Sequence, residues 1–291
     1  MTNNTTQTQR LIAVIVVVLA ALFMIVAEPY LMVMTLNPAL HALVEYYSPQ
    51  LGPTWDPPVK ILSMTYSIWM AAAVFAGSLL LVIAKSIYEG EKWARPVALG
   101  ALSIPSIGGM TMVIPWMVLV LGGGGLASTH SGPPPALAIM GVGLVAYYIV
   151  LLSEKADWKM KVAQLVVFTA LGVVAGMVFM NAQHGVRFFM ARPSAPFFEM
   201  DESVPELILG GYVNYAAVTL FVISIPLLAL RTRLGWQLAM TAAITTAAVS
   251  LLSFIDRAST EWLQGAFLSL GMAAILLIPF FKNRIVNEAT E

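Results

Sequence analysis

The chain has 291 residues, of which 59% are hydrophobic and 10% charged, and its 15 basic and 15 acidic residues give a net charge of zero. A nucleic-acid-binding protein needs a basic face, so this charge balance excludes a nucleic-acid partner. The sequence has no cysteine, which excludes disulfides, thiolate metal sites and cysteine-ligated iron–sulfur clusters. Because a soluble domain carries roughly 25% charged residues, the composition indicates an integral membrane protein.

Eight apolar windows are long enough to cross a bilayer, which takes about 20 residues per helix. None of them has a Lys or Arg in its interior, as burial in hydrocarbon requires. We therefore predict an all-α, polytopic integral membrane bundle, with residues 1–291 forming a single transmembrane domain. The eight transmembrane helices are expected at about 11–33, 61–84, 96–121, 134–153, 160–182, 206–230, 235–255 and 262–281.

The basic residues gather in alternate connections, which predicts the orientation in the membrane. If the N-terminus is cytoplasmic, the outer segments hold only Lys60, Arg187, Arg192 and Arg257. The inner segments then hold the other eleven, which are Arg10, Lys85, Lys92, Arg95, Lys155, Lys159, Lys161, Arg231, Arg233, Lys282 and Arg284. We expect a multi-pass protein of the cell (plasma) membrane with both termini cytoplasmic.

The connections predict where large partners could bind. The inner connections are short, whereas residues 34–60 and 183–205 are expected to form two long outer connections, the first rich in proline and aromatic residues. No connection between the spans is expected to form a soluble domain, so any large partner must be a separate chain.

Small residues inside the spans favour close contacts between helices, and prolines favour a kink or a break in a helix. Gly172 and Gly176, and likewise Ala73 and Gly77, have the four-residue spacing that lets helices approach closely in lipid. The alternative is that Gly and Ala are simply abundant here. The prolines and glycines of span 96–121 could break the helix at mid-depth, as in transporters, or leave it kinked and structural, which we favour because no charged residue accompanies them.

Polar and ionisable side chains at membrane depth cost free energy and therefore mark candidate sites. In this sequence they concentrate in the outer half of the spans, where some share a helix face through spacings of three or four residues. The candidates are Glu28, Asn181, His184, Glu206, Asn214 and Asp256. The alternative is ordinary capping of helix ends at the interface, where Glu206 would suit a helix N-terminus.

These candidates could frame the head group of a quinone, the one cofactor that the sequence suggests. Such a ligand needs hydrogen-bond donors for two carbonyls, a titratable group for the proton and lipid access for its tail. Intrinsic haem is not expected. The three histidines, His41, His130 and His184, all fall on outer loops or span ends, so no facing pair of axial ligands is available within the spans.

The favoured hypothesis is an integral membrane subunit of a respiratory or other electron-transfer complex, with a quinone pocket near the outer face. By its size, its eight spans and its lack of haem ligands, the chain resembles the quinol-oxidising membrane anchors of the polysulfide-reductase type. That resemblance is one of architecture, and it implies further membrane or peripheral redox subunits as partners. Two alternatives stay open: a secondary transporter or channel for a small solute, with Glu28 as its proton or cation site, and a purely structural or assembly subunit.

The orientation can be tested with cysteines in this cysteine-free chain. Ser128→Cys and Ser194→Cys place a thiol in predicted outer connections, and Ala156→Cys places one in a predicted inner connection. In sealed, right-side-out membranes an impermeant thiol reagent should label the first two variants and not the third. Labelling of Ala156→Cys would overturn the orientation.

Overall fold

The computed structural model describes residues 7–51, 56–122, 132–154, 156–190 and 203–287, and within these ranges every regular element is a helix. Helices with π-helical geometry are labelled η. The order is α1 Gln7–Leu22, η1 Phe23–Ala27, α2 Glu28–His41, η2 Ala42–Tyr47, α3 Ser48–Leu51, α4 Asp56–Glu89, α5 Ala94–Pro115, η4 Trp116–Leu121, α6 Ala136–Leu152, α7 Trp158–Met190, α8 Ser203–Ala229, α9 Arg233–Arg257, α10 Thr260–Leu277 and α11 Pro279–Ile285.

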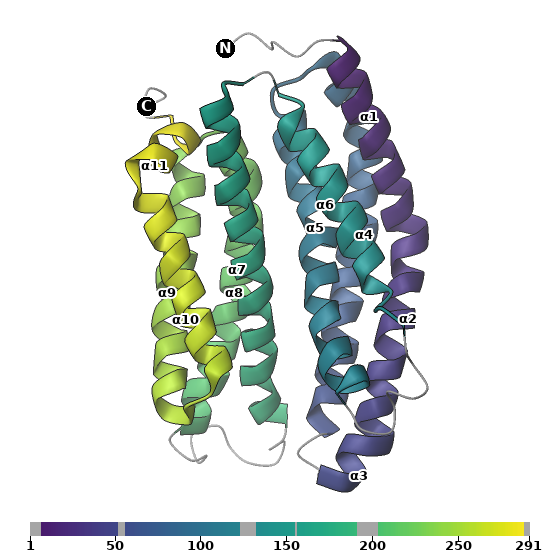
Figure 1. Cartoon of the computed structure of the whole chain (residues 1–291), viewed down its shortest axis with the longest axis vertical. Coiled ribbons are helices and arrows are strands. Elements are labelled where there is room, and N and C mark those ends of the chain that lie inside the picture. The colour runs from purple at the N-terminus through teal and green to yellow at the C-terminus, as the bar shows by residue number, and fades with distance from the viewer. Residues whose placement is uncertain (1–6, 52–55, 123–131, 155, 191–202, 288–291) are drawn as a thin grey trace.

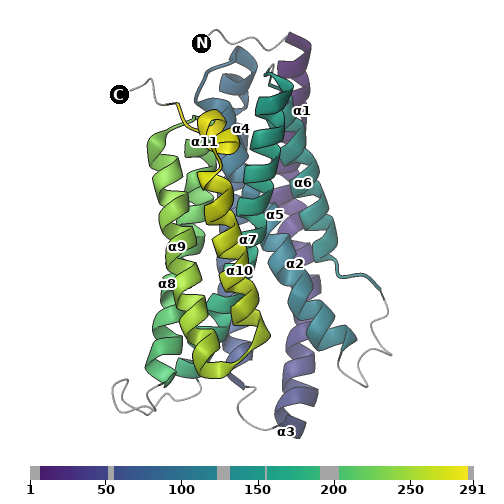
Figure 2. The same ribbon diagram turned by 60° about the vertical axis from the view of Figure 1, so that its left-hand side comes forward.

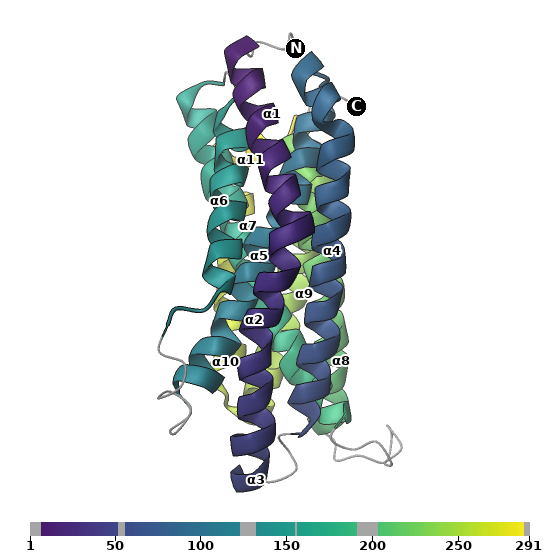
Figure 3. The ribbon, with the colours of Figure 1, turned by 90° about the vertical axis from the view of Figure 1, so that its right-hand side faces the viewer.

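The long helices pack as two four-helix bundles that follow one another along the chain (Figure 1). In the N-terminal bundle (α1–α6), α4 packs on α1, α5 on α4 and α6 on α5, and α6 closes the bundle against α1, as Figure 3 shows. In the C-terminal bundle (α7–α11), α7, α8, α9 and α10 repeat this pattern, with α10 returning to α7. The bundles meet along one seam, where α4 and α5 contact α7 and α5 also contacts α8.

The two ends of the molecule are named from the position of α1. The first turn of α1 and the short helix α11 lie at one end, called the proximal end, and α3 lies at the other, called the distal end (Figures 1 and 2). Within the described ranges seven helical segments are long and apolar enough to cross a membrane, and Ala136–Leu152 is a shorter apolar helix.

Large apolar side chains cover the outside of both bundles. Phe75 is 77% exposed, Val82 78% and Ile255 71%. A water-soluble surface seldom presents so much contiguous apolar area, whereas a lipid-facing surface requires it. The fold is therefore that of a multi-pass, all-helical membrane protein.

The first helical segment is longer than the sequence predicts. Residues 34–51, expected to belong to an outer connection, continue the helix, and the segment Gln7–Gln50 runs for 44 residues. Pro29 and Pro38 each lack a backbone N–H and should interrupt a helix. The π-helical turn η1 ends two residues before Pro29, and η2 begins four residues after Pro38 and ends two residues before Pro49. Such local changes of hydrogen-bond spacing let a membrane helix continue past proline.

The last predicted span ends earlier than expected. α10 ends at Leu277 rather than near 281, and α11 follows as a separate helix. Ile278 between them is extended, with ψ at 122°, because a residue before proline is disfavoured in the α conformation. Pro279 then occupies the first turn of α11, where its missing N–H costs nothing.

The glycines of span 96–121 serve helix packing. Helical geometry continues from Ala94 to Leu121 without a break, as the structural interpretation of its prolines predicts. A Cβ atom on Gly109 would lie 2.5 Å from the backbone nitrogen of Met140, and one on Gly108 would lie 3.2 Å from the Trp69 ring. These glycines let α5 approach α6 and α4 closely.

The two pairs of small residues with four-residue spacing have different surroundings in the structure. A Cβ on Gly77 would lie 2.9 Å from the carbonyl oxygen of Ala21, so this glycine does sit at a close helix contact between α4 and α1. A Cβ on Gly172 would meet nothing within 4 Å, whereas one on Gly176 would clash with the side chain of Met110 of α5. The closest approach of α7 and α8 involves Gly185 and Gly211 instead, which the spacing did not single out.

The α7–α8 contact gives a stability prediction. A methyl group added by Gly211→Ala would lie 2.8 Å from the Val186 nitrogen and 3.0 Å from the Ala182 carbonyl oxygen, so backbone must move. We expect a loss of about 1–3 kcal/mol in the free energy of unfolding, measured by thermal unfolding in detergent. Gly172→Ala is the matched control and should be neutral or slightly stabilising. Equal unfolding temperatures for the two variants would contradict the close approach.

Candidate functional site

A cavity of about 250 Å³ lies between the two bundles near the distal end, and we call it the distal cavity. Four helical segments of the N-terminal bundle and two helices of the C-terminal bundle supply its walls. Most of the lining is aliphatic, with polar groups from α7 and α10 on one side. The lining residues are Leu43, Pro58, Ile61, Leu62, Ile114, Pro115, Val118, Leu119, Met180, Gln183, His184, Arg187 and Glu261.

The polar side of the distal cavity is built around His184. The imidazole Nδ1 lies 3.4 Å from Glu261 Oε2, and the ring centroid is 6.1 Å from that of the buried Trp262. Arg187, one turn further along α7, lies within electrostatic range of both His184 and Glu261. The His184 side chain is 29% exposed. A proton-binding side chain, a cation and an anion therefore converge at one edge of an apolar cavity.

Gln183 forms the second polar feature of the cavity and joins the two bundles. Its Nε2 donates a 2.7 Å hydrogen bond to the hydroxyl of Thr65, which in turn donates to the Ile61 carbonyl oxygen. Gln183 and Thr65 are both buried. The bond fixes the α7 backbone against α4, and so it holds the neighbouring His184 in register with the apolar wall.

Among the residues predicted from the sequence, His184 lines the distal cavity and Asn181 lies beside it. Asn181 Nδ2 donates a 3.4 Å hydrogen bond to the Glu261 carbonyl oxygen, so it helps to position the residue that faces His184. Asp256 is at the end of α9, paired with Arg257 at 3.2 Å, and does not line the cavity. Glu206 is in the first turn of α8, and its side chain lies outside the described part of the structure.

Glu28 lies in the N-terminal bundle, apart from the distal cavity. It shares the buried face of the first helical segment with Met24, Met32 and Thr35. The side chain is fully buried, and neither carboxyl oxygen has a hydrogen-bond partner among the described residues. Thr35 is satisfied by contrast, because its hydroxyl donates to the Leu31 carbonyl oxygen and accepts from the Ala136 N–H at the start of α6.

Asn214 lies inside the C-terminal bundle. It is fully buried in α8, and both its amide nitrogen and its amide oxygen lack partners among the described residues. The buried Ser250 hydroxyl of α9 is likewise without a partner there. Ser250 and Asn181 both approach Gly265 of α10, whose missing Cβ leaves room for the Asn181 amide. None of these three side chains lines the distal cavity.

Sequence reasoning did not identify Gln183 as a cavity residue. Its partner Thr65 is 118 positions away, and a single sequence gives no signal for such a contact. Glu261 was visible as a charge at the start of the last span, but its pairing with His184 depends on how α10 packs on α7.

The titratable residues of the described structure do not form a metal site. The described residues contain no group of three or more His, Asp or Glu placed to hold a metal ion. His41 lies on the distal part of the first helical segment, where its Nδ1 is 3.0 Å from Glu45, and His130 lies outside the described residues. Comparisons with protein-family models, curated proteins and solved structures give no match for this chain.

The unpartnered carboxyl of Glu28 gives a second stability prediction. Glu28→Met keeps the side-chain length and removes a buried polar group, so we expect the free energy of unfolding to rise by on the order of 1 kcal/mol or more. Thr35→Val, on the same buried face, should lower it by about 1–3 kcal/mol because the Ala136 N–H loses its acceptor. Thermal unfolding in detergent measures both. If Glu28→Met proves as destabilising as Thr35→Val, then the carboxyl group has a partner in the working protein.

Proposed function

We propose that the chain is an integral membrane subunit of a respiratory or other electron-transfer complex and that it binds a quinone or quinol in the distal cavity. The observation that carries this proposal is the apolar cavity between the bundles, which has Gln183, His184, Arg187 and Glu261 along one side. Ligand sites are commonly apolar cavities with a few convergent polar groups.

The dimensions and the lining suit a single ring with an isoprenoid-like tail. The cavity volume of about 250 Å³ lies just below the usual range for ligand sites, about 300–1,000 Å³, so the ring would fill it and the tail would leave it. Val118 is both a lining residue and 57% exposed on the lipid-facing surface. The η4 side of the cavity therefore offers the tail a route to the bilayer.

The polar residues have separate roles in this proposal. The ligand, when bound, supplies the two-electron, two-proton redox chemistry. His184 is positioned to hold or accept a proton from a ring oxygen, and Glu261 orients its imidazole and stabilises the protonated form. Arg187 can donate to the other ring oxygen. The lack of cysteine excludes a cysteine-ligated iron–sulfur cluster in this chain, and in this proposal a partner subunit holds the redox centre that receives the electrons.

The proposed topology has eight crossings, with the proximal end cytoplasmic and the distal cavity near the outer face of the plasma membrane. α6 has 17 residues, the lower limit for a span, and covers about 25 Å at 1.5 Å per residue. The first turn of α1 and α11 lie at the same end (Figure 1), as an even number of crossings requires. Lys and Arg concentrate in the connections of that end.

Substitution of His184 tests the quinone site. His184→Ala should lower quinol-dependent electron transfer by on the order of 10²-fold, because a preorganised proton acceptor and hydrogen-bond partner is lost. His41→Ala is the matched control, since His41 also pairs with a glutamate but does so on an exposed surface away from the cavity. The rate is measured in the assembled complex, with subunit content checked by mass spectrometry. Normal turnover in assembled His184→Ala complexes would end the proposal.

The two-bundle seam favours transport of a small solute as a second candidate function. Cavities lie at both ends of the seam, and between them Phe179 contacts Trp69 and Tyr215 with ring centroids 5.4 and 5.6 Å apart. Two bundles that rock about such an aromatic closure would give alternating access. A transporter works without partner subunits, so solute flux in proteoliposomes of the purified chain, together with unaffected electron transfer in His184→Ala, would favour it.

A further inference from the structure

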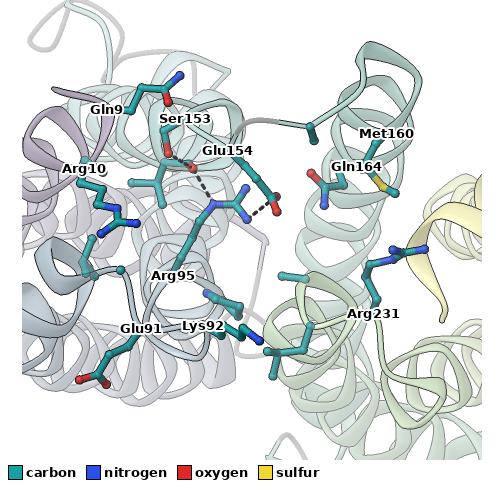
Figure 4. A pocket seen from close by; sticks show the side chains of 18 of the residues that line it. Gln9, Arg10, Glu91, Lys92, Arg95, Ser153, Glu154, Met160, Gln164 and Arg231 are labelled. Atoms are coloured by element: carbon teal, nitrogen blue, oxygen red, sulfur yellow. Dashed lines mark hydrogen bonds and ion pairs between the residues drawn. The ribbon is translucent and has the colours of Figure 1, made fainter. Parts of the chain in front are cut away.

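A larger cavity, of about 560 Å³, opens between the two bundles at the proximal end, and we call it the proximal cavity. Figure 4 shows Arg10, Lys92 and Arg95 on the wall of the N-terminal bundle and Gln164 and Arg231 on the wall of the C-terminal bundle. No step of the proposed quinone chemistry uses this cavity.

The charge of the proximal cavity is positive. Its lining includes five basic residues, Arg10, Lys92, Arg95, Arg231 and Arg284, and three acidic residues. Two of the three carboxylates already have partners: Glu154 pairs with Arg95 at 2.6 Å, and Glu91 accepts from the Trp93 indole. In Figure 4 Glu91 points away from the cavity. Basic pockets between membrane helices at a cytoplasmic face attract anionic head groups.

Part of this charge has a structural role. Arg95 donates to the Val150 and Leu151 carbonyl oxygens at the end of α6, and Arg10 donates to the Glu89 carbonyl oxygen at the end of α4. Both are therefore committed to helix C-termini, where cations are favourable. Lys92, in contrast, makes no hydrogen bond or ion pair with another described residue, and Figure 4 shows it between the two walls.

On the wall formed by the C-terminal bundle, two buried polar atoms have no hydrogen-bond partner among the described residues. They are the Oε1 of Gln164, an acceptor, and the Nε of Arg231, a donor. A buried polar atom without a partner costs about 1–3 kcal/mol, and the two residues that carry these atoms, Gln164 and Arg231, line the cavity. A ligand that satisfies them must offer an acceptor to Arg231 and a donor to Gln164.

We propose that the proximal cavity binds a phosphate group that brings hydroxyl donors with it. Phosphate oxygens match Arg231 and Lys92, and a hydroxyl matches the Gln164 oxygen. A glycerophosphate lipid head group and free protonated inorganic phosphate share this chemistry. A choline head group lacks the hydroxyl donor and adds a cation to an already positive cavity.

The test measures binding of phosphatidylglycerol, phosphatidylcholine and inorganic phosphate to the purified full chain by native mass spectrometry and thermal unfolding. Arg231→Gly removes the guanidinium at a position with φ of 62°, a conformation that glycine adopts without strain. Lys92→Gln removes the second charge. Lys85→Gln is the matched control, because Lys85 precedes the same turn but is 83% exposed, pairs with Glu89 and does not line the cavity.

We expect phosphatidylglycerol to bind more tightly than phosphatidylcholine, and Arg231→Gly and Lys92→Gln each to weaken it by roughly tenfold. Lys85→Gln should stay within about twofold of the unsubstituted chain, since an exposed charge contributes little. Gln164→Leu adds an independent readout. It should raise the unfolding temperature without ligand, because an unpartnered oxygen is removed, and should reduce the rise that phosphatidylglycerol produces.

Competition between inorganic phosphate and phosphatidylglycerol distinguishes the two possible sources of the phosphate group. If inorganic phosphate alone stabilises the chain and displaces phosphatidylglycerol, the site is one for a soluble phosphate compound. Equal binding of the two lipids, an equal loss in Lys85→Gln and Arg231→Gly, or no response to either phosphate source would overturn the proposal. None of these outcomes depends on the ligand of the distal cavity.

Discussion

Close backbone contact between helices is the interaction on which the rest of the structure depends. Lipid is as apolar as a leucine side chain, so burial of apolar surface does not drive membrane helices together, and packing at small residues takes its place. The contacts of Gly77 with α1, Gly109 with α6 and Gly211 with α7 supply this packing. Sequential neighbours thereby form two closed four-helix bundles, and what remains is the seam between them.

The seam between the two bundles holds both candidate ligand sites. Both the distal and the proximal cavity lie on it, and each has one wall from either bundle. Gln183 and Thr65, which are 118 positions apart in the chain, meet across this seam.

The candidate polar residues are of two kinds, those buried inside one bundle and those that line a cavity. Glu28 and Asn214 are fully buried inside the N-terminal and C-terminal bundles respectively, away from either cavity. His184 and Arg231 line cavities that a ligand could enter. Because a buried polar group without a partner lowers stability, the first kind bears on the stability of each bundle and the second on binding.

The sequence by itself determined the membrane character, the all-helical class and the approximate positions of the long helices, because twenty consecutive apolar residues leave a backbone no partner but its own helix. Local geometry around proline was harder to predict, and residues 34–51 were expected in a connection because the compensating π-helical turns have no clear sequence signal. Only the tertiary structure decided which polar residues meet. It brought Glu261 to His184 at the distal cavity, which neither Glu28 nor Asp256 lines. The depth of a residue along its helix can be counted from the sequence, whereas its facing neighbour depends on how the helices pack.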